Sequence, residues 1–581
     1  MNFVRLAHIQ LIAKSIGELT YEQILAPRKI GDKTFELTFA SGATYSFSGW
    51  MTIWEYLRVD ESSIRRNGVE ANCAGTFFLD AQEELQMDDI VLGNFLEEMH
   101  NSLYNDSELL KKQHELSARK IALLDGEEVQ NIISGHPKIL LSKGRLGWGI
   151  KELAAYSPEN ENPIKLRWIA VLKEHALFSI DENKTANDLL LESFDESALA
   201  LFKEHLNKSK INLNDYIILP VHPWQWDRFI KIQYLKYVND KTIVDLGIHG
   251  DEYLPQISLR TFRNVSRANK ADIKLPISIL NTSAVRGIPA KFMDIGPALS
   301  QILQTICSED EILRDKGTDI LKEYAGVSFE HPEFKKIAGA PYRYKEYLGA
   351  IYRESSHSKI RSNEMAVMTG ALFYKDSNNN SLVGEYVKKA EISMQKWLES
   401  YFEHVVIPLY HLQLRYGIGL VAHGQNVMVK LTNFIPSGVL LKDFQGDLRL
   451  STDSILLQDS KNHFVTNKLE KLPAHYLIHD LLTGHLVTVL RFVSATLKEC
   501  DGLKEDEFYS VLNQVVRKYH DVRVIAQELS LLMPQIDRVL LNKVRFSMGY
   551  ADTNQRLRPA VGDKLNNPLV ASTNDKKVRY E

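Results

Sequence analysis

Residues 254–289 combine two strand-like runs with many cationic side chains. The runs QISLRT and IKLPIS alternate apolar and polar residues with a period of two, which is typical of β-strands. On such strands Ser258 shares a face with Arg260, and Lys274 shares one with Pro276, so we expect some of the cations to converge on one side of a sheet. The cations that face the single acid Asp272 in this stretch are Arg260, Arg263, Arg267, Lys270, Lys274 and Arg286. A surface of this kind suits a polyanion.

Small hydroxyl side chains are interleaved with these cations. Ser258, Thr261, Thr282 and Ser283 carry O–H groups that can donate to phosphate oxygens beside Arg and Lys. Charged residues are usually exposed, so a solvated surface hairpin is the alternative interpretation of the cluster taken alone. The hydroxyl groups favour the phosphate-binding interpretation.

The length of the chain excludes a single hydrophobic core. At 581 residues it is expected to form three or four lobes, and turn-forming residues place boundaries near residues 130 and 330. We therefore divide it into lobes 1–130, 131–330 and 331–581. The formal net charge of -4 gives no global basic character, which argues against a nucleic-acid partner.

The cysteines and the first residues indicate the cellular compartment. Cys73, Cys307 and Cys500 lie far apart without a CxxC pair, which argues against a disulfide framework or a zinc–thiolate site and fits a reducing compartment. Arg5 and Lys14 interrupt the apolar residues at the start, and no later run is expected to span a membrane. We expect a cytoplasmic protein with no membrane association.

The spacing of apolar residues predicts an α+β protein with a helical C-terminal part. Helices are predicted over residues 5–25, 81–124, 196–206, 296–323, 386–416, 472–497 and 508–532. Further strands are predicted over residues 35–39, 43–47, 167–172, 216–221, 420–430 and 439–443. The polar tail after Met548 is expected to be loosely ordered.

Several common nucleotide and zinc signatures are absent from the sequence. It has no GxxxxGK[ST] P-loop, no GxGxxG after a strand, no kinase HRD or DFG set and no HExxH helix. A bound phosphate would therefore need a cradle of another kind. One candidate is the glycine-bounded loop 135–147, in which His136, Lys143 and Arg145 could wrap a phosphate or a carboxylate. An ordinary surface loop is the alternative.

Three other segments place polar side chains after strand-like runs. Residues 222–225 (HPWQ) follow IILPV, and they either face a ligand crevice or form a packing corner. Residues 422–426 (AHGQN) and 442–447 (KDFQGD) lie at two strand edges that we expect to be close together. Oxygen ligands from Asn426 and Asp443 would suit a Mg²⁺ ion that holds nucleotide phosphates, and hydrogen-bonded turns are the alternative.

Taken in order, these segments resemble the IucA/IucC-type siderophore synthetases, which are ATP-dependent and act independently of nonribosomal peptide synthetases. Seven short motifs in the right order are far more specific than any one alone. They are GHPxHPxxKxRxG with ELxxYxPE at 135–159, HPWQ at 222–225, SxRT at 258–261, KLxxxxxxTSxxR at 274–286, AHxQN at 422–426, DFQG at 443–446 and NPL at 567–569.

Two departures from the family pattern concern the acid pocket and the metal. Ile139-Leu140 replace the second HP of the first motif, which affects how this loop grips an acyl substrate. Val421 stands where an acid often precedes AH, so Asp443 and Asp447 are left to bind the metal.

The resemblance implies an architecture and a reaction. Members look like a cupped hand of thumb, fingers and palm, with mixed or antiparallel sheets and with ATP in the central cleft. They activate a carboxylate of citrate or a citrate derivative as an acyl-adenylate, with Mg²⁺ as the metal. An amine or a hydroxyl then attacks, and AMP and pyrophosphate are released. A homodimer is also implied.

Residue roles follow from the resemblance at the matching positions. Catalysis at the α-phosphate would involve Arg260, Lys274, Arg286 and His423, and the nucleotide would contact Ser258, Thr261, Thr282, Ser283, Gln425 and Asn426. The polycarboxylate would bind His136, Lys143 and Arg145, and Mg²⁺ would bind Asp443 and Asp447. The sequence identifies neither the amine nor a base for it.

Two functions of other classes stay open at this point. One is a non-catalytic protein that binds citrate or a ferric chelate in the same cleft, which the two departures favour. The other is a kinase-like phosphotransferase, which would release ADP.

Overall fold

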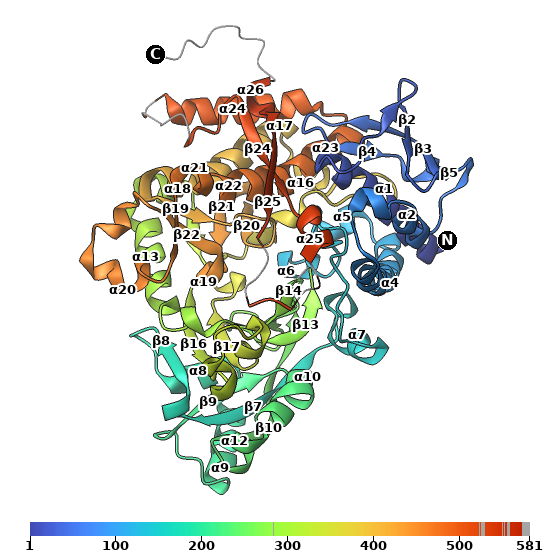
Figure 1. Ribbon diagram of the computed structural model, residues 1–581. Coiled ribbons are helices and arrows are strands. Elements are labelled where there is room, and N and C mark those ends of the chain that lie inside the picture. The colour runs from blue at the N-terminus through green and yellow to red at the C-terminus, as the bar shows by residue number, and fades with distance from the viewer. Residues whose placement is uncertain are drawn as a thin grey trace.

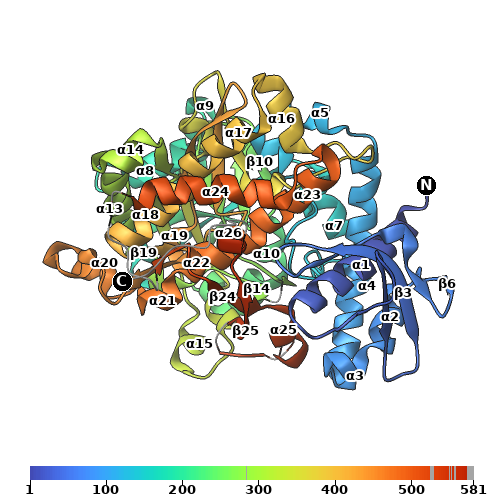
Figure 2. The same cartoon turned by 90° about the horizontal axis from the view of Figure 1, so that it is seen from above.

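The computed structural model describes residues 1–282, 284–521, 523, 529–548, 550, 552–554 and 558–571. Helices and sheets alternate along the chain, which confirms the predicted α+β class. Figure 1 shows a large sheet in the lower part of the molecule, the N-terminal elements at the upper right and the C-terminal helices across the top. The view from above in Figure 2 shows α24 (Glu505–His520) lying across this upper face.

The N-terminal part packs helices against a six-stranded sheet. Helix α1 (Phe3–Tyr21) begins at Asn2, whose side chain accepts a hydrogen bond from the Arg5 N–H. It packs against α4 (Asp89–His114) and against β4 (Leu57–Val59). The predicted hairpin is confirmed as β2 (Thr34–Thr38) and β3 (Thr44–Met51), whose alternate aromatic residues are buried.

An eight-stranded antiparallel sheet forms the middle of the chain. Its order is β8-β16-β17-β12-β11-β10-β7-β9. The strands are β7 (Ile164–Leu172), β8 (Leu177–Ile180), β9 (Tyr216–Val221), β10 (Ile243–Pro255), β11 (Thr261–Asn264), β12 (Asp272–Lys274), β16 (Glu323–Ser328) and β17 (Gly349–Arg353). Lys274 pairs with Thr261 on one side and Ile351 on the other, so it lies well inside the sheet.

The cationic stretch is less regular than its alternation predicted. Ser258 and Arg260 lie in a turn between β10 and β11, so the prediction that they share a strand face is wrong. The Ser258 hydroxyl accepts the Thr261 N–H and thereby closes the turn, which residue alternation cannot reveal. IKLPIS is divided between β12 and β13 (Ile277–Asn281) at Pro276, which has no N–H to donate to a ladder.

The predicted helix over residues 296–323 ends early. Helices α13 (Gly296–Glu309) and α14 (Glu311–Asp315) are followed by β15 (Thr318–Ile320), because Gly317 takes a φ of 67° that a helix cannot continue. Strand β15 pairs in parallel with β21 (Ile435–Leu441), within a sheet completed by β20 (Val427–Thr432) and β18 (Glu364–Met368). Strand β15 lies before residue 330 but pairs with a strand that follows it, and β17 lies after residue 330 but belongs to the eight-stranded sheet. The three lobes divided at 130 and 330 therefore stay a prediction.

Other C-terminal predictions also need correction. The helix over 386–416 is α16 (Leu382–Ala390), α17 (Met394–Tyr401) and α18 (Ile407–Tyr416), with Glu391 left-handed at the first break. The strand over 420–430 is β19 (Ile418–Leu420) and β20 with a loop between them. The tail was wrongly expected to be loosely ordered over 560–571, because β25 (Ala560–Asn566) pairs with β24 (Gln535–Leu540) and α26 (Pro568–Ala571) follows.

One helical stretch, Ala474–Asp501, is long and apolar enough to cross a membrane, contrary to the expectation that no such run exists. However, 89% of its apolar window is buried inside the protein. A helix that is apolar on most sides can serve as a core helix, and we interpret this one so.

Candidate functional site

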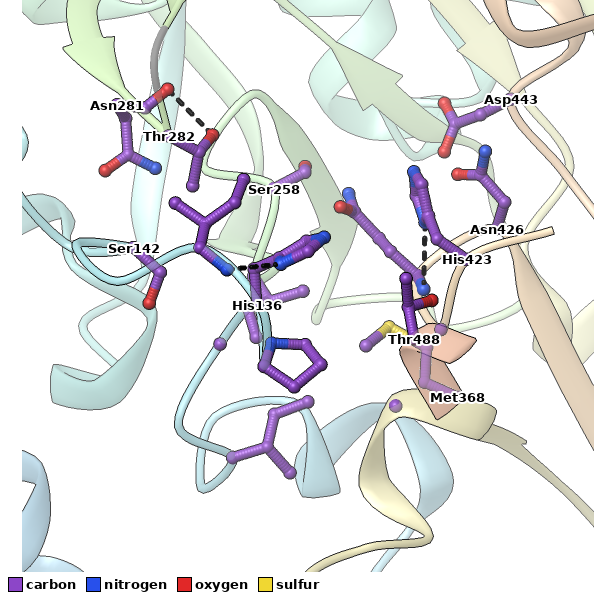
Figure 3. A pocket seen from close by; sticks show the side chains of 18 of the residues that line it. His136, Ser142, Ser258, Asn281, Thr282, Met368, His423, Asn426, Asp443 and Thr488 are labelled. Atoms are coloured by element: carbon purple, nitrogen blue, oxygen red, sulfur yellow. Dashed lines mark hydrogen bonds between the residues drawn. The ribbon is translucent and has the colours of Figure 1, made fainter. Parts of the chain in front are cut away.

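One cavity of about 300 Å³ gathers most of the predicted site residues from four separate segments. Figure 3 shows His136, Ser142 and Thr282 on one side of it and His423, Asn426 and Asp443 on the other. The predicted residues that line it are His136, Lys143, Arg145, Ser258, Arg260, Lys274, Thr282, Arg286, His423, Gln425, Asn426, Asp443 and Asp447.

Two predicted site residues are not placed there. Thr261 does not line the cavity, since it is buried at the start of β11 with 2% of its surface exposed. Its backbone N–H instead fixes the Ser258 hydroxyl at 3.0 Å. Ser283 lies outside the residues that the structure describes.

Strained backbone surrounds the cavity. Arg145 (φ 44°), Leu259 (φ 65°), Thr282 (φ 50°) and Asp443 (φ 65°) all occupy the left-handed region, which side chains other than Gly, Asn and Asp rarely adopt. Arg145, Leu259 and Thr282 each cost about 1–3 kcal/mol in this conformation, whereas Asp443 tolerates it, and such conformations tend to cluster at functional sites. The strain here aims cavity side chains that regular strands would point elsewhere.

The loop 135–147 is anchored from both sides. Leu146 exchanges two backbone hydrogen bonds with Leu280 of β13, at 3.0 and 3.1 Å. On the other side the Lys14 ammonium of α1 donates to the carbonyl oxygens of His136 (3.0 Å), Ile139 (2.5 Å) and Leu140 (3.5 Å). Although Ile139-Leu140 replace the second HP of the family pattern, the Lys14 ammonium holds their backbone carbonyls, so this part of the loop forms a fixed wall.

Gly135 needs its missing side chain to make the start of this loop. Its φ is 95°, and a Cβ would lie 2.8 Å from the Ser142 hydroxyl oxygen. The first motif thus requires glycine at this position for both conformation and space.

Lys143 and Arg145 are already ion-paired. The Arg145 guanidinium donates to both carboxylate oxygens of Glu159 at 2.7 and 3.0 Å, and its other terminal nitrogen donates to Ser157 at 2.7 Å. Lys143 binds Asp106 at 3.1 Å. Burial alone would raise the pKa of Glu159, but Arg145 and Lys143 lower it to about 2. Glu159 of the ELxxYxPE part of the first motif is therefore the counter-ion of Arg145 in the GHPxHPxxKxRxG part.

Three of the six cations of residues 254–289 reach the cavity. Lys274 binds Asp443 at 2.6 Å, Arg286 Nε donates to the Asn281 carbonyl at 3.0 Å, and Arg260 donates to the Gly287 carbonyl. The other three do not line it, and among them Arg267 pairs with Asp251. The expected convergence on one side is real for Arg260, Lys274 and Arg286.

The AHGQN loop is fixed by close backbone packing. The Gly370 N–H donates to the Gly424 carbonyl at 3.0 Å, and a Cβ on Gly424 would lie 2.6 Å from Gly370 Cα. Asn426 donates from Nδ2 to the Val421 carbonyl (3.0 Å) and to Asp447 (3.1 Å). Its Oδ1 accepts no hydrogen bond from the described residues, so it can accept one from a ligand.

The two cavity histidines are neutral donors. Burial lowers the pKa of His136 and of His423, so both imidazoles are uncharged at neutral pH. His136 Nδ1 accepts the Ile139 N–H at 3.1 Å, and His423 Nδ1 accepts the Gln425 N–H at 3.3 Å (Figure 3). The proton of each neutral ring therefore resides on Nε2, which can donate to an anionic ligand.

A buried polar network behind Asp443 was not predicted from the sequence. Asp272 accepts from Arg353 at 2.7 Å and from Gln256 at 3.0 Å, and Gln256 also donates to Glu127. Arg353 donates to Asp443 at 3.3 Å. Asp272 could have been singled out from the sequence because it is the only acid in the cationic stretch, whereas Arg353 belongs to no motif.

The HPWQ segment forms a packing corner. His222 is fully buried, which lowers its pKa to about 3, and its ring packs against Tyr156 and Phe262. Gln225 donates to the Ser278 hydroxyl at 2.9 Å. This motif supports β13 rather than lining the cavity.

The side chains of the cavity can hold Mg²⁺ only if oxygen atoms of a substrate also bind the metal. The described residues contain no group of three His, Cys, Asp or Glu side chains that could hold a metal. Asp443 and Asp447 nevertheless bring two carboxylates to one cavity, the number that Mg²⁺ commonly takes when phosphates and water complete its shell. Burial would raise the pKa of Asp443, but Lys274, Arg353 and Lys442 hold it well below its usual value, so it is ionised.

Comparisons with known proteins cover the whole chain. The profile described as "IucA / IucC family" matches residues 127–374, and that described as "Ferric iron reductase FhuF-like transporter" matches residues 395–553. Aerobactin synthase of Escherichia coli is 37% identical over 574 residues, which cover 98% of each chain.

Solved structures show the same fold. Aerobactin synthetase IucC from a hypervirulent pathotype of Klebsiella pneumoniae has a TM-score of 0.88 at 36% identity, with 99% of each chain covered. ATP-bound aerobactin synthetase IucA from such a pathotype has a TM-score of 0.79 at 17% identity, covering 97% of this chain and 99% of that one.

Proposed function

This chain belongs to the IucA/IucC family and is a siderophore biosynthetic ligase, and from that premise we propose how its cavity works. It uses ATP to adenylate a carboxyl group of citrate or a citrate derivative. It then joins the acyl group to an amine or a hydroxyl and releases AMP and pyrophosphate.

The charge of the cavity supports this proposal most strongly. Its charged side chains are five cations and two carboxylates, namely Lys143, Arg145, Arg260, Lys274 and Arg286 against Asp443 and Asp447. ATP and a polycarboxylate together carry many negative charges. A cleft with an excess of cations raises the local concentration of such substrates.

In the first step a carboxylate oxygen attacks the α-phosphorus of ATP, and pyrophosphate leaves with the bonding electrons. Negative charge then increases on the α-phosphate oxygens. Arg260, Lys274 and Arg286 stabilise this charge, and one preorganised donor in a water-poor site contributes about 3–4 kcal/mol. Thr282 and Leu259, which are held left-handed, fix the backbone beside two of these cations.

Neutral donors complete the binding of both substrates. His423 donates from Nε2 to a phosphate oxygen, and Ser258, Thr282, Ser283, Gln425 and Asn426 contact the nucleotide, whereas Thr261 acts only through the turn that holds Ser258. His136, Lys143 and Arg145 bind the polycarboxylate. Only the Nε of Arg145 has no hydrogen-bond partner among the described residues. The guanidinium must therefore bind Glu159 and the substrate at the same time.

Mg²⁺ fits at Asp443 and Asp447 and would neutralise charge on the phosphates of ATP. Asp443 shares its carboxylate with Lys274 and Arg353, which a carboxylate can do because it offers about four acceptor positions. The ion pairs hold this carboxylate in place and ionised.

In the second step the lone pair of the nucleophile forms a bond to the acyl carbon. The bond from that carbon to the AMP oxygen breaks, AMP leaves with the electron pair, and the proton of the nucleophile passes to solvent. We further propose that the enzyme works as a cytoplasmic homodimer on small molecules, with no nucleic-acid or membrane partner.

Product analysis tests the proposal. The protein is supplied with ATP, Mg²⁺, an amine panel and one acid at a time from citrate, succinate and 2-oxoglutarate. The proposal expects AMP and pyrophosphate, with the highest rate for citrate. ADP would indicate a phosphotransferase, and no turnover with any acid would indicate a protein that only binds its ligand.

A further inference from the structure

A second, larger cavity of about 880 Å³ adjoins the site. It lies among α1, the end of α4, the 3₁₀ turn Glu61–Ser63 and a loop near residue 375. Helices α1 and α4 and strand β4 lie side by side in this part of the molecule (Figures 1 and 2). Residues Gly135, His136, Pro137, Gly370 and Phe373 line both cavities.

We propose that the second cavity binds the nucleophile of the ligase reaction, an aliphatic amine that enters in its cationic form. This assignment rests on the proposed function and adds the site of its second substrate. The shared wall places the end of a molecule bound here next to the acyl group in the first cavity.

Charge separates the two cavities. The second is lined by the cationic side chains Lys14, Arg58 and Lys375 and by the carboxylates Asp60, Glu61, Asp376 and Glu499, and the α-ammonium of Met1 brings its charges into balance. The first cavity has five cations against two carboxylates. A polyanion is therefore favoured in the first cavity, whereas the balanced second cavity can accept an ammonium ion beside one of its carboxylates.

Glu61 is the carboxylate best placed to bind the ammonium. Glu499 already binds Arg58 at 2.7 Å and Lys375 at 3.0 Å, and the other two carboxylates accept backbone N–H groups. No described residue donates a hydrogen bond to the side chain of Glu61, which stands in the first turn of its 3₁₀ helix. A cationic ligand would give it a partner.

The remaining wall suits an aliphatic chain. Apolar and aromatic side chains from three helices and one loop line the cavity, namely Phe3, Leu6, Tyr56, Leu110 and Phe492. Methylene groups that pack on them are removed from water, which favours binding of an aliphatic chain. Such a wall with a few charged groups is the usual composition of a small-molecule site.

The reaction across the shared wall balances without a protein base. The attacking ammonium group first loses a proton to solvent, which frees its lone pair to form the new C–N bond. The acyl C–O bond breaks as AMP leaves with the electrons, and a second proton passes from the new amide nitrogen to solvent. Hydroxylamine can attack the same carbon but has no chain to place in the second cavity.

The test compares these two kinds of nucleophile with ATP and citrate throughout. The amine used in the test is whichever of 1,5-diaminopentane, spermidine, ornithine and lysine the parent enzyme uses with the highest kcat/KM. Glu61→Gln is expected to raise the KM of this amine about tenfold, since a hydrogen bond to a charged group is weakened. Leu6→Trp is expected to lower its kcat/KM about tenfold, because the larger indole takes up part of the space in which the amine's chain would pack.

Hydroxylamine capture should be unchanged in both variants. Glu97→Gln is the matched control, because Glu97 is an exposed carboxylate of α4 that lines neither cavity, and it should alter neither reaction. Unchanged amine kinetics in both variants, or equal losses with amine and hydroxylamine, would overturn the proposal. So would capture of hydroxylamine by an enzyme that uses none of the four amines. If the parent captures no hydroxylamine, no adenylate forms, and the proposed function itself has failed.

Discussion

The two cavities share a wall but differ in how they are built. In the first, Arg145, Thr282 and Asp443 hold left-handed backbone conformations among loops and strand ends. In the second, which is lined by residues of α1, α4 and α23 (Arg491–Asp501) and by several loops, Asn379 is the only described non-glycine residue with positive φ, and asparagine tolerates it readily. The first has an excess of cations, whereas the cations and carboxylates of the second balance once the α-ammonium of Met1 is counted.

This difference indicates where geometry must be fixed. Strain of about 1–3 kcal/mol per residue persists only where the surrounding structure maintains it. A transition state at phosphorus needs donors at set positions, whereas a flexible chain needs mainly space and one charge. Substitutions in the first cavity should therefore affect the chemical step, and those in the second should affect the use of one substrate.

The largest effect is expected for Arg286→Ala. Removal of one donor to the α-phosphate should lower ATP–pyrophosphate exchange with citrate about 100-fold to 1000-fold. Lys270→Ala is the control, because Lys270 belongs to the same cationic stretch and does not line the cavity. Exchange at the parental rate in Arg286→Ala would remove this residue from the chemical step.

Lys14→Met tests the shared wall. The three carbonyl groups at 136, 139 and 140 lose their common donor, so the wall should lose its fixed position between the two cavities. We expect kcat/KM to fall about tenfold for citrate and for the amine alike, with Lys14→Arg retaining more activity. Loss for only one of the two substrates would contradict a common wall.

Asp443→Asn tests the metal. Loss of the charge should raise the Mg²⁺ concentration for half-maximal activity about tenfold while the KM for citrate changes less. The ion pairs with Lys274 and Arg353 are also weakened, so thermal stability should be measured in parallel. An unchanged Mg²⁺ requirement would move the metal to Asp447.

Arg145→Ala separates acid binding from nucleotide binding. The KM for citrate should rise about tenfold, while calorimetry without citrate should show nearly unchanged ATP affinity. The variant leaves Glu159 without its main partner, so Arg145→Ala/Glu159→Gln controls for an unpaired buried carboxylate. Abolished ATP binding with intact citrate binding would mean that the two halves of the cavity are exchanged.

The smallest effect concerns pH. Burial lowers the pKa of His136 and of His423 below that of an ordinary histidine, so both rings are neutral at neutral pH and protonate at lower pH than an exposed imidazole. The kcat/KM for ATP should therefore vary less than about threefold as pH falls from 8 to 6.5. A loss centred near pH 6.5 that disappears in His423→Asn would show a histidine with an ordinary pKa.

Periodicity and motif order were enough to predict much of the site. Strand β9 was predicted at its observed bounds, and α1 and the N-terminal hairpin were predicted nearly so, because their apolar residues follow one regular period. The residues that line the cavity were predicted from motifs that occur in the same order as in the family pattern.

Features that depend on distant contacts escaped prediction. The turn at 258–260 is closed by one hydroxyl, which period-two alternation conceals. Arg353 meets Asp272 across the paired strands β12 and β17 and meets Asp443 just after the end of β21 in another sheet, and no local pattern marks it. The second cavity joins segments from Phe3 to Glu499, so its charge balance exists only in the folded chain.

The most direct test of the account follows the carboxylate oxygen. Citrate labelled with ¹⁸O in its carboxyl groups is incubated with ATP, Mg²⁺ and an accepted amine, and the AMP is examined by mass spectrometry. If the acid attacks the α-phosphorus and the acyl C–O bond later breaks, each AMP formed in a complete turnover carries one ¹⁸O atom from citrate. Unlabelled AMP, or label found in inorganic phosphate beside ADP, would contradict activation as an acyl-adenylate.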